Sequence, residues 1–140
     1  MRDSYYNKKV LITGHTGFKG TWLCHILSRM GAKVYGYALE PPTTPNLFDL
    51  CGMHSRMESK TGDIRDLDEL ISYVNKVRPE IVFHLAAQPI VRESYANPVY
   101  TYQVNVMGTV NLLESIRRCE TVKSVVNVTT DKVYRNREWC

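Results

Sequence analysis

Short apolar segments alternate along this chain with stretches of helical periodicity, and this alternation is the strongest constraint on its fold. We predict strands over residues 10–12, 33–39, 58–61, 81–85 and 125–128. The fourth of these is apolar on both faces, which is typical of a central parallel strand covered by helices on two sides. Parallel strands need helical crossovers. We therefore predict an α/β fold, a doubly wound parallel sheet with helices on both faces.

Three longer stretches have the periodicity of amphipathic helices. We expect helices over residues 18–30, 67–77 and 98–119, and Pro98 suits the first turn of the last one. In the first helix, Phe18, Trp22, Leu23, Ile26, Leu27 and Met30 recur at helical spacing. In the last helix, the side chains expected to face the core are Val104, Met107, Leu112 or Leu113, and Ile116.

The composition of the chain excludes several classes of protein. Hydrophobic residues make up 44% of the chain and charged residues 23%, as in a globular rather than a disordered protein. No apolar run approaches the roughly 18 residues of a membrane span, and the N-terminus lacks a signal-peptide core. We therefore expect a cytoplasmic protein. The net charge of +4 is spread along the chain, so we expect no nucleic-acid or membrane partner.

Cysteines and histidines are too scattered to form a structural metal site. The four cysteines, Cys24, Cys51, Cys119 and Cys140, include no CxxC pair, and the four histidines do not cluster with them. Without an export signal we expect reduced thiols. Cys24 and Cys119 fall within helical patterns, where we expect them to act as small apolar side chains.

The segment that follows the first predicted strand combines a tight turn with the start of a helix. It reads Gly14-His15-Thr16-Gly17-Phe18-Lys19-Gly20. Glycines let a pyrophosphate approach the backbone, and a helix N-terminus offers N–H groups and partial positive charge. The spacing G-x-x-G-x-x-G has one more residue between its first two glycines than the dinucleotide fingerprint G-x-G-x-x-G. The segment also lacks the Lys-Ser/Thr of a P-loop. We interpret it as a dinucleotide-binding turn; the alternative is a tight turn without a ligand.

An acid that binds the adenine ribose is expected about 20 residues further on, near the end of the second strand. That place holds Ala38-Leu39-Glu40, so Glu40 is the candidate, with a solvated loop carboxylate as the alternative. No arginine lies there to hold the 2′-phosphate of NADP, which favours NAD as the cofactor.

Five stretches together resemble the extended short-chain dehydrogenase/reductases, and within that superfamily the CDP-glucose 4,6-dehydratases. They are TGHTGFKG (13–20), TGDIRD (61–66), IVFHLAAQPIVR (81–92), YQVNVMGTVNLLE (102–114) and VVNVTTDKVY (125–134). The superfamily is indicated by the glycine turn, the H-x-A-A motif and the N-x-x-G-T motif. The subfamily is indicated by GHTGFKG, LAAQP, the loop PPTTPNLF, and Thr-Asp-Lys where dTDP-glucose relatives carry Thr-Asp-Glu.

The resemblance implies a Rossmann-like NAD site. Besides the glycine turn (Gly14, Thr16, Gly17, Phe18, Lys19, Gly20), Asp63 and Ile64 would lie by the adenine. The backbone of Ala86 and Ala87 would border the cofactor, and Asn105 would line the site. For Asp63 the alternative is a turn or capping carboxylate after Gly62, and for the two alanines it is close packing at a strand end.

Two histidines lie near these motifs. His84 sits in an apolar strand, and we interpret it as a hydrogen-bonded core histidine rather than a catalytic base. His15 stands where relatives carry a small residue, which leaves the tightness of the pyrophosphate fit open.

The resemblance also implies a lyase that converts CDP-glucose to CDP-4-keto-6-deoxyglucose in deoxysugar biosynthesis, here for lipopolysaccharide O-antigen. In this family, C4 of the sugar is oxidised first and hydride passes to NAD, because the ketone acidifies the C5 proton. Water then leaves across C5–C6, and hydride returns to C6.

The triplet Thr130-Asp131-Lys132 stands where the acid–base pair of such an enzyme is expected. Thr130 would hydrogen-bond the sugar, and a protonated Asp131 would act as the acid toward the C6 oxygen. Lys132 would remove the C5 proton, which requires a lowered pKa. The alternative for Asp131 and Lys132, favoured by spacing alone, is a surface turn with a solvated ion pair.

The resemblance implies a Tyr-x-x-x-Lys pair on the helix after the fifth strand, with which the family deprotonates the C4 hydroxyl, and no such pair follows residue 128 here. Neither Tyr37 nor Tyr134 has a lysine four residues later on a helix. The chain ends at Cys140, directly after a strand that should lead into another helix. We therefore expect residues 1–140 to be the N-terminal part of an NAD-binding Rossmann domain, truncated after its fifth strand. The remainder and the substrate domain would lie beyond Cys140.

By itself the 140-residue chain should be inactive, and the complete protein should form a homodimer or larger homo-oligomer. Two alternatives remain open. One is an NAD-dependent sugar-nucleotide epimerase, for which a C5 base and a C6 acid are unnecessary. The other is a non-catalytic dinucleotide-binding module.

Overall fold

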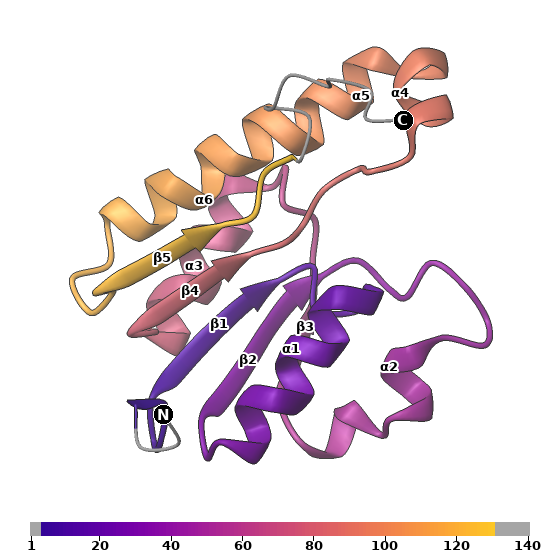
Figure 1. Ribbon diagram of the computed structural model, residues 1–140. Helices are drawn as coiled ribbons and strands as arrows, with labels where there is room; N and C mark the ends of the chain where they lie inside the picture. The colour runs from indigo at the N-terminus through magenta and orange to yellow at the C-terminus, as the bar shows by residue number, and fades with distance from the viewer. Residues whose placement is uncertain (1–3, 131–140) are drawn as a thin grey trace, which may run out of the picture.

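The computed structural model describes residues 4–130 and contains one five-stranded parallel sheet. The strands are β1 (Lys9–Thr13), β2 (Lys33–Ala38), β3 (Glu58–Thr61), β4 (Ile81–His84) and β5 (Ser124–Asn127). Their order across the sheet is β3-β2-β1-β4-β5, and every neighbouring pair is parallel (Figure 1). Both the fold class and all five predicted strands are confirmed.

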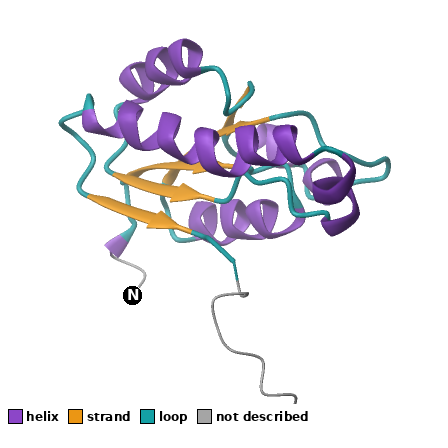
Figure 2. Ribbon diagram, turned by 90° about the horizontal axis from the view of Figure 1, so that it is seen from above, coloured by secondary structure: helices purple, strands orange, loops and turns teal. Residues whose placement is uncertain are grey.

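Helices cover both faces of this sheet (Figure 2). They are α1 (Phe18–Arg29), α2 (Leu47–Leu50), α3 (Leu67–Val77), α4 (Val91–Ala96), α5 (Pro98–Tyr102) and α6 (Gly108–Arg117). A 3-10 turn spans Met53–Ser55, and a π-helical segment, Gln103–Met107, joins α5 to α6. None of the helices within residues 4–130 has the length and apolar character needed to cross a membrane.

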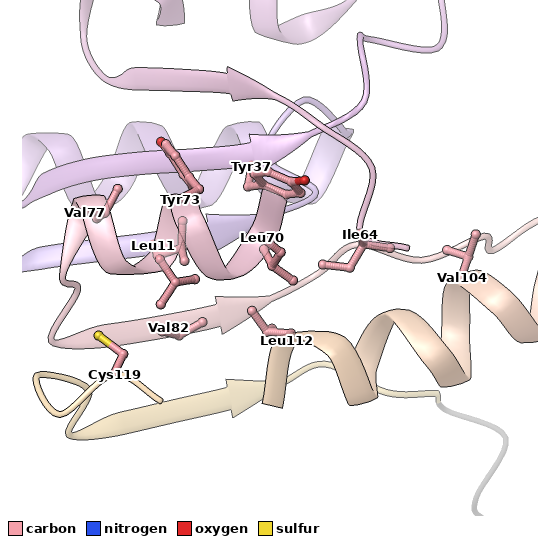
Figure 3. Packing of buried hydrophobic residues seen from close by; sticks show 11 residues of the cluster. Leu11, Tyr37, Ile64, Leu70, Tyr73, Val77, Val82, Val104, Leu112 and Cys119 are labelled. Atoms are coloured by element: carbon pink, nitrogen blue, oxygen red, sulfur yellow. The ribbon is translucent and has the colours of Figure 1, made fainter. Parts of the chain in front are cut away.

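Alternate side chains of β1 belong to two separate hydrophobic cores. Leu11 packs with α3 and α6 in a cluster that also contains Leu70, Val82 and Leu112 (Figure 3). Val10 and Ile12 point to the opposite face, where α1 and α2 cover them. Because successive side chains of a strand face opposite sides of the sheet, a strand buried on both faces must be apolar at every position.

The apolar residues that recur at helical spacing in α1 do not all lie on its buried face. Phe18, Trp22 and Ile26 are 70%, 47% and 50% exposed. The buried positions are Gly20, Thr21, Cys24 and Leu27. The reason is the short distance between this helix and the turn that precedes it, since a Cβ on Gly20 would lie 2.2 Å from the carbonyl oxygen of Gly14. Small residues therefore face the sheet, and the bulky apolar residues lie outside.

The helix predicted over residues 98–119 is present, but part of its predicted inward face is wrong. Val104 and Leu112 are buried as expected, whereas Met107 and Leu113 are 50% and 48% exposed. A π-helical turn contains more residues than an α-helical turn, so the segment Gln103–Met107 rotates the positions that follow it. The helix α4 and the short helix α2 fall in segments for which we predicted no element.

Candidate cofactor-binding site

The chain leaves β1 and β4 in opposite directions, and this divides the carboxyl edge of the sheet. All the strands in Figure 1 point toward that edge. From β1 the chain enters α1, which covers one face, and from β4 it continues to α6, which covers the other. In doubly wound sheets, ligands bind outside the carboxyl ends of the strands where neighbouring connections diverge in this way. The predicted site residues within residues 4–130 are gathered along this edge.

The glycine turn lies tightly against the loop that follows β4. Gly14 has a φ of 71°, and a Cβ there would lie 2.7 Å from the backbone nitrogen of Ala86. A Cβ on Gly20 would lie 2.2 Å from the carbonyl oxygen of Gly14, so no side chain fits there. In contrast, a Cβ on Gly17 would meet only the Gly14 oxygen, at 3.4 Å, and otherwise point into open space. Gly14 and Gly20 are thus needed for the close packing of the turn, whereas Gly17 leaves open space beside it.

The first turn of α1 is suited to hold an anion. Gly17 is its N-cap, no side chain caps the helix, and the first turn contains no acidic residue. Backbone N–H groups and the partial positive charge of the helix N-terminus are therefore left for an anion. Lys19 is exposed beside them. Thr16 Oγ1 donates to the carbonyl oxygen of Leu39 at 2.9 Å, which ties the turn to the end of β2.

The ring of His15 turns away from this turn and is completely buried beneath β2. Nε2 lies 2.7 Å from Ser59 Oγ, and the ring packs edge-on against Phe48 with 5.3 Å between centroids. A Cβ on Gly36 would lie 2.4 Å from the ring, so a glycine makes room for it. Burial lowers the pKa of His15 to about 4. His15 therefore takes no space on the open side of the glycine turn.

The two candidate carboxylates near the adenosine end each have a partner. Glu40 Oε1 accepts a hydrogen bond from Thr61 Oγ1 at 2.6 Å. Asp63 accepts from the backbone N–H of Arg65 at 2.9 Å and is also held by the guanidinium, which lowers the pKa of this carboxyl. The turn carboxylate proposed as an alternative for Asp63 is thus present. A carboxylate has about four lone-pair positions. Glu40, with one such contact, therefore has room for a further donor, whereas Arg65 already makes four contacts to the two oxygens of Asp63.

Ile64 itself is 5% exposed and packs against Gly108 of α6, so only its backbone faces the edge. Asp63 and Arg65 border a shallow hollow of about 500 Å³. The guanidinium of Arg65 also lies 5.0 Å from the ring centre of Tyr100. Arg65 therefore connects the end of β3 to α5.

Asn105 holds the loop that follows β4. Its Oδ1 accepts from the backbone N–H of Gln88 at 2.7 Å, and its Nδ2 donates to the carbonyl of Gln88 at 3.0 Å. Within this loop, Ala86 is partly buried and Ala87 is exposed. Asn105 thus reaches the site through the backbone of Gln88. As contacts to a cofactor, all the residues of the glycine turn, Asp63, Ile64, Ala86, Ala87 and Asn105 remain predictions.

His84 is a hydrogen-bonded core histidine, and this prediction is confirmed. It is 3% exposed, and both ring nitrogens have partners, Thr13 and Thr109. Burial lowers the pKa of the ring to about 4. An imidazole without contact to the open edge is poorly placed to act on a substrate.

Of the predicted catalytic triplet, only Thr130 lies within the described residues. It follows β5 by three residues on the carboxyl side of the sheet. Asp131 and Lys132 lie outside the described residues, as do Tyr134 and Cys140. Their roles remain predictions.

The cysteines of the described chain are packing residues. Cys24 and Cys119 are 0% and 5% exposed, as predicted, and Cys51 is partly exposed. Across residues 4–130, no three His, Cys, Asp or Glu side chains are grouped closely enough to hold a metal ion.

Three residues of the site escaped the sequence analysis. Thr13 accepts from the N–H groups of Leu85 and Ala86, both at 3.2 Å, and Gln88 is the residue that Asn105 holds. Arg65 is the third. One signal for Thr13 was available, since a hydroxyl at the end of an otherwise apolar strand needs a partner.

Comparisons with known proteins agree with this geometry. The chain is 53% identical over 138 residues to a CDP-glucose 4,6-dehydratase of Salmonella typhimurium, covering 99% of this chain and 38% of the relative. A solved UDP-glucose 4-epimerase of Brucella ovis in complex with NAD is 28% identical, with a TM-score of 0.72 over 86% of this chain and 35% of that one. A UDP-glucose-4-epimerase of Stenotrophomonas maltophila, 24% identical, matches the fold with a TM-score of 0.83 over 96% of this chain and 40% of that one.

The chain spans about two fifths of the length of these relatives. The predicted resemblance to the CDP-glucose 4,6-dehydratases is confirmed by the first of them. The sequence model of GDP-mannose 4,6 dehydratase matches residues 11–138, nearly the whole chain. This chain therefore belongs to the GDP-mannose 4,6 dehydratase family of nucleotide-sugar enzymes.

Proposed function

We propose that this chain is the N-terminal part of the NAD-binding domain of a CDP-glucose 4,6-dehydratase. The observation that carries the proposal is the open side of the glycine turn. At Gly17 a Cβ would fill space beside an uncapped helix N-terminus, which is where a pyrophosphate would approach the backbone. The identity of 53% to a CDP-glucose 4,6-dehydratase supports the choice of reaction and of nucleotide sugar.

The residues present fit NAD along the whole edge. The turn from Gly14 to Gly20 would hold the pyrophosphate, and Asp63 and Ile64 would lie by the adenine. The backbone at Ala86 and Ala87 would border the nicotinamide half. At the end of β2 the carboxylate of Glu40 would repel the 2′-phosphate of NADP, so the proposal is for NAD. When bound, NAD would accept a hydride from the sugar and return it.

The chain's own groups would supply the proton transfers of the dehydration. Thr130 would orient the sugar, Lys132 would hold the proton taken from C5, and Asp131 would donate a proton to the departing C6 hydroxyl. These two transfers would release one water from the sugar once its C4 is a ketone, and C5 would regain a proton when hydride returns to C6. The base for the C4 hydroxyl would belong to the remainder of the protein, together with the pocket for the cytidine.

The exposed face of α5 and α6 supports a homo-oligomer for the complete protein. It presents four apolar side chains that are between 48% and 70% exposed: Val99, Val106, Val110 and Leu113. Contiguous apolar surface of this kind is typical of protein–protein interfaces. A cytoplasmic location and a role in O-antigen deoxysugar synthesis belong to the same proposal.

The test is an assay of the complete protein with CDP-glucose and catalytic NAD. We expect a product lighter by one water, and a product formed in deuterated water should carry deuterium at C5. The segment 1–140 should bind NAD without forming this product. A product of unchanged mass would contradict the dehydratase and favour the epimerase. Binding of NAD without turnover by the complete protein would favour the non-catalytic module.

Replacement of the acid and the base separates dehydratase from epimerase more directly. In the complete protein, Asp131→Asn or Lys132→Ala should slow dehydration at least about a hundredfold. The sugar should stall as a C4 ketone that keeps its C6 hydroxyl. The matched control is Asp68→Asn, an exposed acid on α3 that should leave the rate unchanged. Near-normal turnover in both variants would contradict these roles.

A further inference from the structure

A series of hydrogen bonds runs from the end of β1 to the loop after β4 and passes through the buried ring of His84. Nδ1 of the imidazole lies 2.6 Å from Thr13 Oγ1, and Nε2 lies 3.1 Å from Thr109 Oγ1. Neither threonine belongs to the predicted cofactor contacts, and the proposed mechanism uses none of the three residues. A fully bonded imidazole in this place therefore needs its own explanation.

The bonds at Thr13 determine which atom carries the proton on that side. A hydroxyl has one proton and two lone pairs. The lone pairs of Thr13 Oγ1 face the N–H groups of Leu85 and Ala86, both at 3.2 Å, and Leu85 shares its N–H with the carbonyl oxygen of Thr13 at 3.1 Å. The hydroxyl proton is left for His84, so Nδ1 accepts and carries no hydrogen.

The bonds at Thr109 assign the other ring nitrogen independently. Thr109 Oγ1 donates its proton to the carbonyl of Asn105 at 2.8 Å. It can therefore only accept from His84, and Nε2 must carry a hydrogen. Both ends assign the same neutral tautomer. The low pKa of the buried ring, about 4, agrees with a neutral imidazole at ordinary pH.

The two ends of this series hold the same loop. At one end Thr13 binds the N–H groups of Leu85 and Ala86. At the other end Thr109 holds the backbone of Asn105, whose side chain binds both backbone groups of Gln88. A shift of the imidazole would therefore move both attachments of the segment 85–88, which packs against Gly14.

We propose that His84, as the neutral tautomer protonated on Nε2, is a positioning residue that fixes the segment 85–88 against the glycine turn. This inference rests on the proposed function only where it assigns NAD to that edge. It goes beyond a packing role because it predicts a coupling between Thr13 and Thr109, which do not contact one another.

The first experiment determines the tautomer directly in the complete protein labelled with ¹⁵N-histidine. We expect the Nδ1 resonance of His84 to be that of an unprotonated nitrogen and Nε2 that of a protonated one, unchanged from pH 8 to pH 6. A proton on Nδ1 would overturn the proposal. This measurement needs neither a variant nor a bound cofactor.

The second experiment measures the coupling through NAD affinity. Thr13→Val and Thr109→Val should each weaken binding about tenfold, and the double variant should also be about tenfold weaker. If the two sites acted independently, their effects would multiply and the double variant would bind NAD about a hundredfold more weakly. That result would overturn the proposal. His84→Gln, whose amide can replace Nε2, should stay within about threefold of the original, whereas His84→Leu should lose about tenfold.

If the complete protein binds no NAD, the proposed function is refuted. The role of His84 is then tested by a measurement that needs no cofactor. Asn105 accepts from the N–H of Gln88, so hydrogen exchange at Gln88 reports the loop without a ligand. We expect His84→Leu to speed exchange at Gln88 at least tenfold more than at Val74, a buried residue of α3. Equal acceleration at both amides would show a role in stability alone.

Discussion

Gly17→Ala is expected to weaken NAD binding at least tenfold while it changes the free energy of unfolding by less than about 1 kcal/mol. Gly17 has extended backbone geometry that any residue can adopt, with φ −73° and ψ 165°. Its added methyl would meet only the Gly14 oxygen, at an ordinary contact distance of 3.4 Å. The methyl would instead occupy the open space in which we place the pyrophosphate, so affinity falls without a loss of stability.

Gly20→Ala should have the opposite signature. Its methyl would lie 2.2 Å from the Gly14 oxygen and 2.8 Å from the Cα of His15, both backbone atoms that cannot turn aside. Either α1 or the turn must move, and overpacking of this kind costs about 3 kcal/mol. We expect a large loss of stability in urea unfolding of the complete protein, with NAD affinity lost as a consequence.

The control for both variants is Gly52→Ala, distant from the cofactor edge. Its φ of 59° makes alanine unfavourable by about 1 kcal/mol, and the methyl would meet nothing within 4 Å. Isothermal titration with NAD should therefore give an unchanged affinity. Normal NAD affinity in Gly17→Ala would place the pyrophosphate elsewhere and remove the observation on which the proposed function rests.

The positions of the strands followed from local sequence alone, because apolar runs and their turns are local features. Even the weak strand β3 has the predicted bounds, Glu58–Thr61. The buried faces of the helices could not be predicted from local sequence in this way. Hydrophobicity selects bulky residues, but α1 packs so closely that Gly20 and Cys24 face the core while Phe18 is exposed. Which face is buried depends on the distance between elements, which the sequence of one element does not contain.

The candidate site also has a part that local sequence predicts and a part that it does not. The glycine turn was predictable because its residues are contiguous and their chemistry is shared by dinucleotide-binding turns. The attachment of Gln88 to Asn105 and of His84 to both threonines was not, because these partners are 17 to 71 residues apart in sequence. The π-helical segment that carries Asn105 also has no local pattern that we could identify.

The two buried histidines should make the protein sensitive to mild acid. His15 and His84 are 0% and 3% exposed, and burial lowers the pKa of each ring from 6.5 to about 4. Between pH 6.5 and 4 the unfolded chain therefore binds protons that the folded chain does not, and the free energy of unfolding falls as the pH falls. The stabilisation is complete above pH 6.5. Each ring accounts for about 3 kcal/mol of the loss.

Carboxylates whose pKa is lowered in the folded protein lose their stabilisation as the pH falls through their unfolded value, 4.5 for a glutamate, so they add to the loss only at the acid end of this window and below it. Glu114, for example, is held by Arg117 and Arg118, which lower its pKa to about 2. A His15→Gln variant isolates one histidine, since glutamine can reach Ser59 and does not titrate. We expect its free energy of unfolding to fall by about 3 kcal/mol less than that of the original protein between pH 6.5 and 4.

The matched control is Ser59→Ala, which removes the hydroxyl 2.7 Å from Nε2 of His15 but keeps the buried ring. Its unfolding free energy should run parallel to that of the original protein across the window. The comparison uses slopes rather than absolute stabilities, so a packing defect at position 15 displaces the curve without changing the conclusion. If the His15→Gln curve also runs parallel to the original, the ring of His15 is accessible to protons in the folded protein, and its burial beneath β2 is wrong.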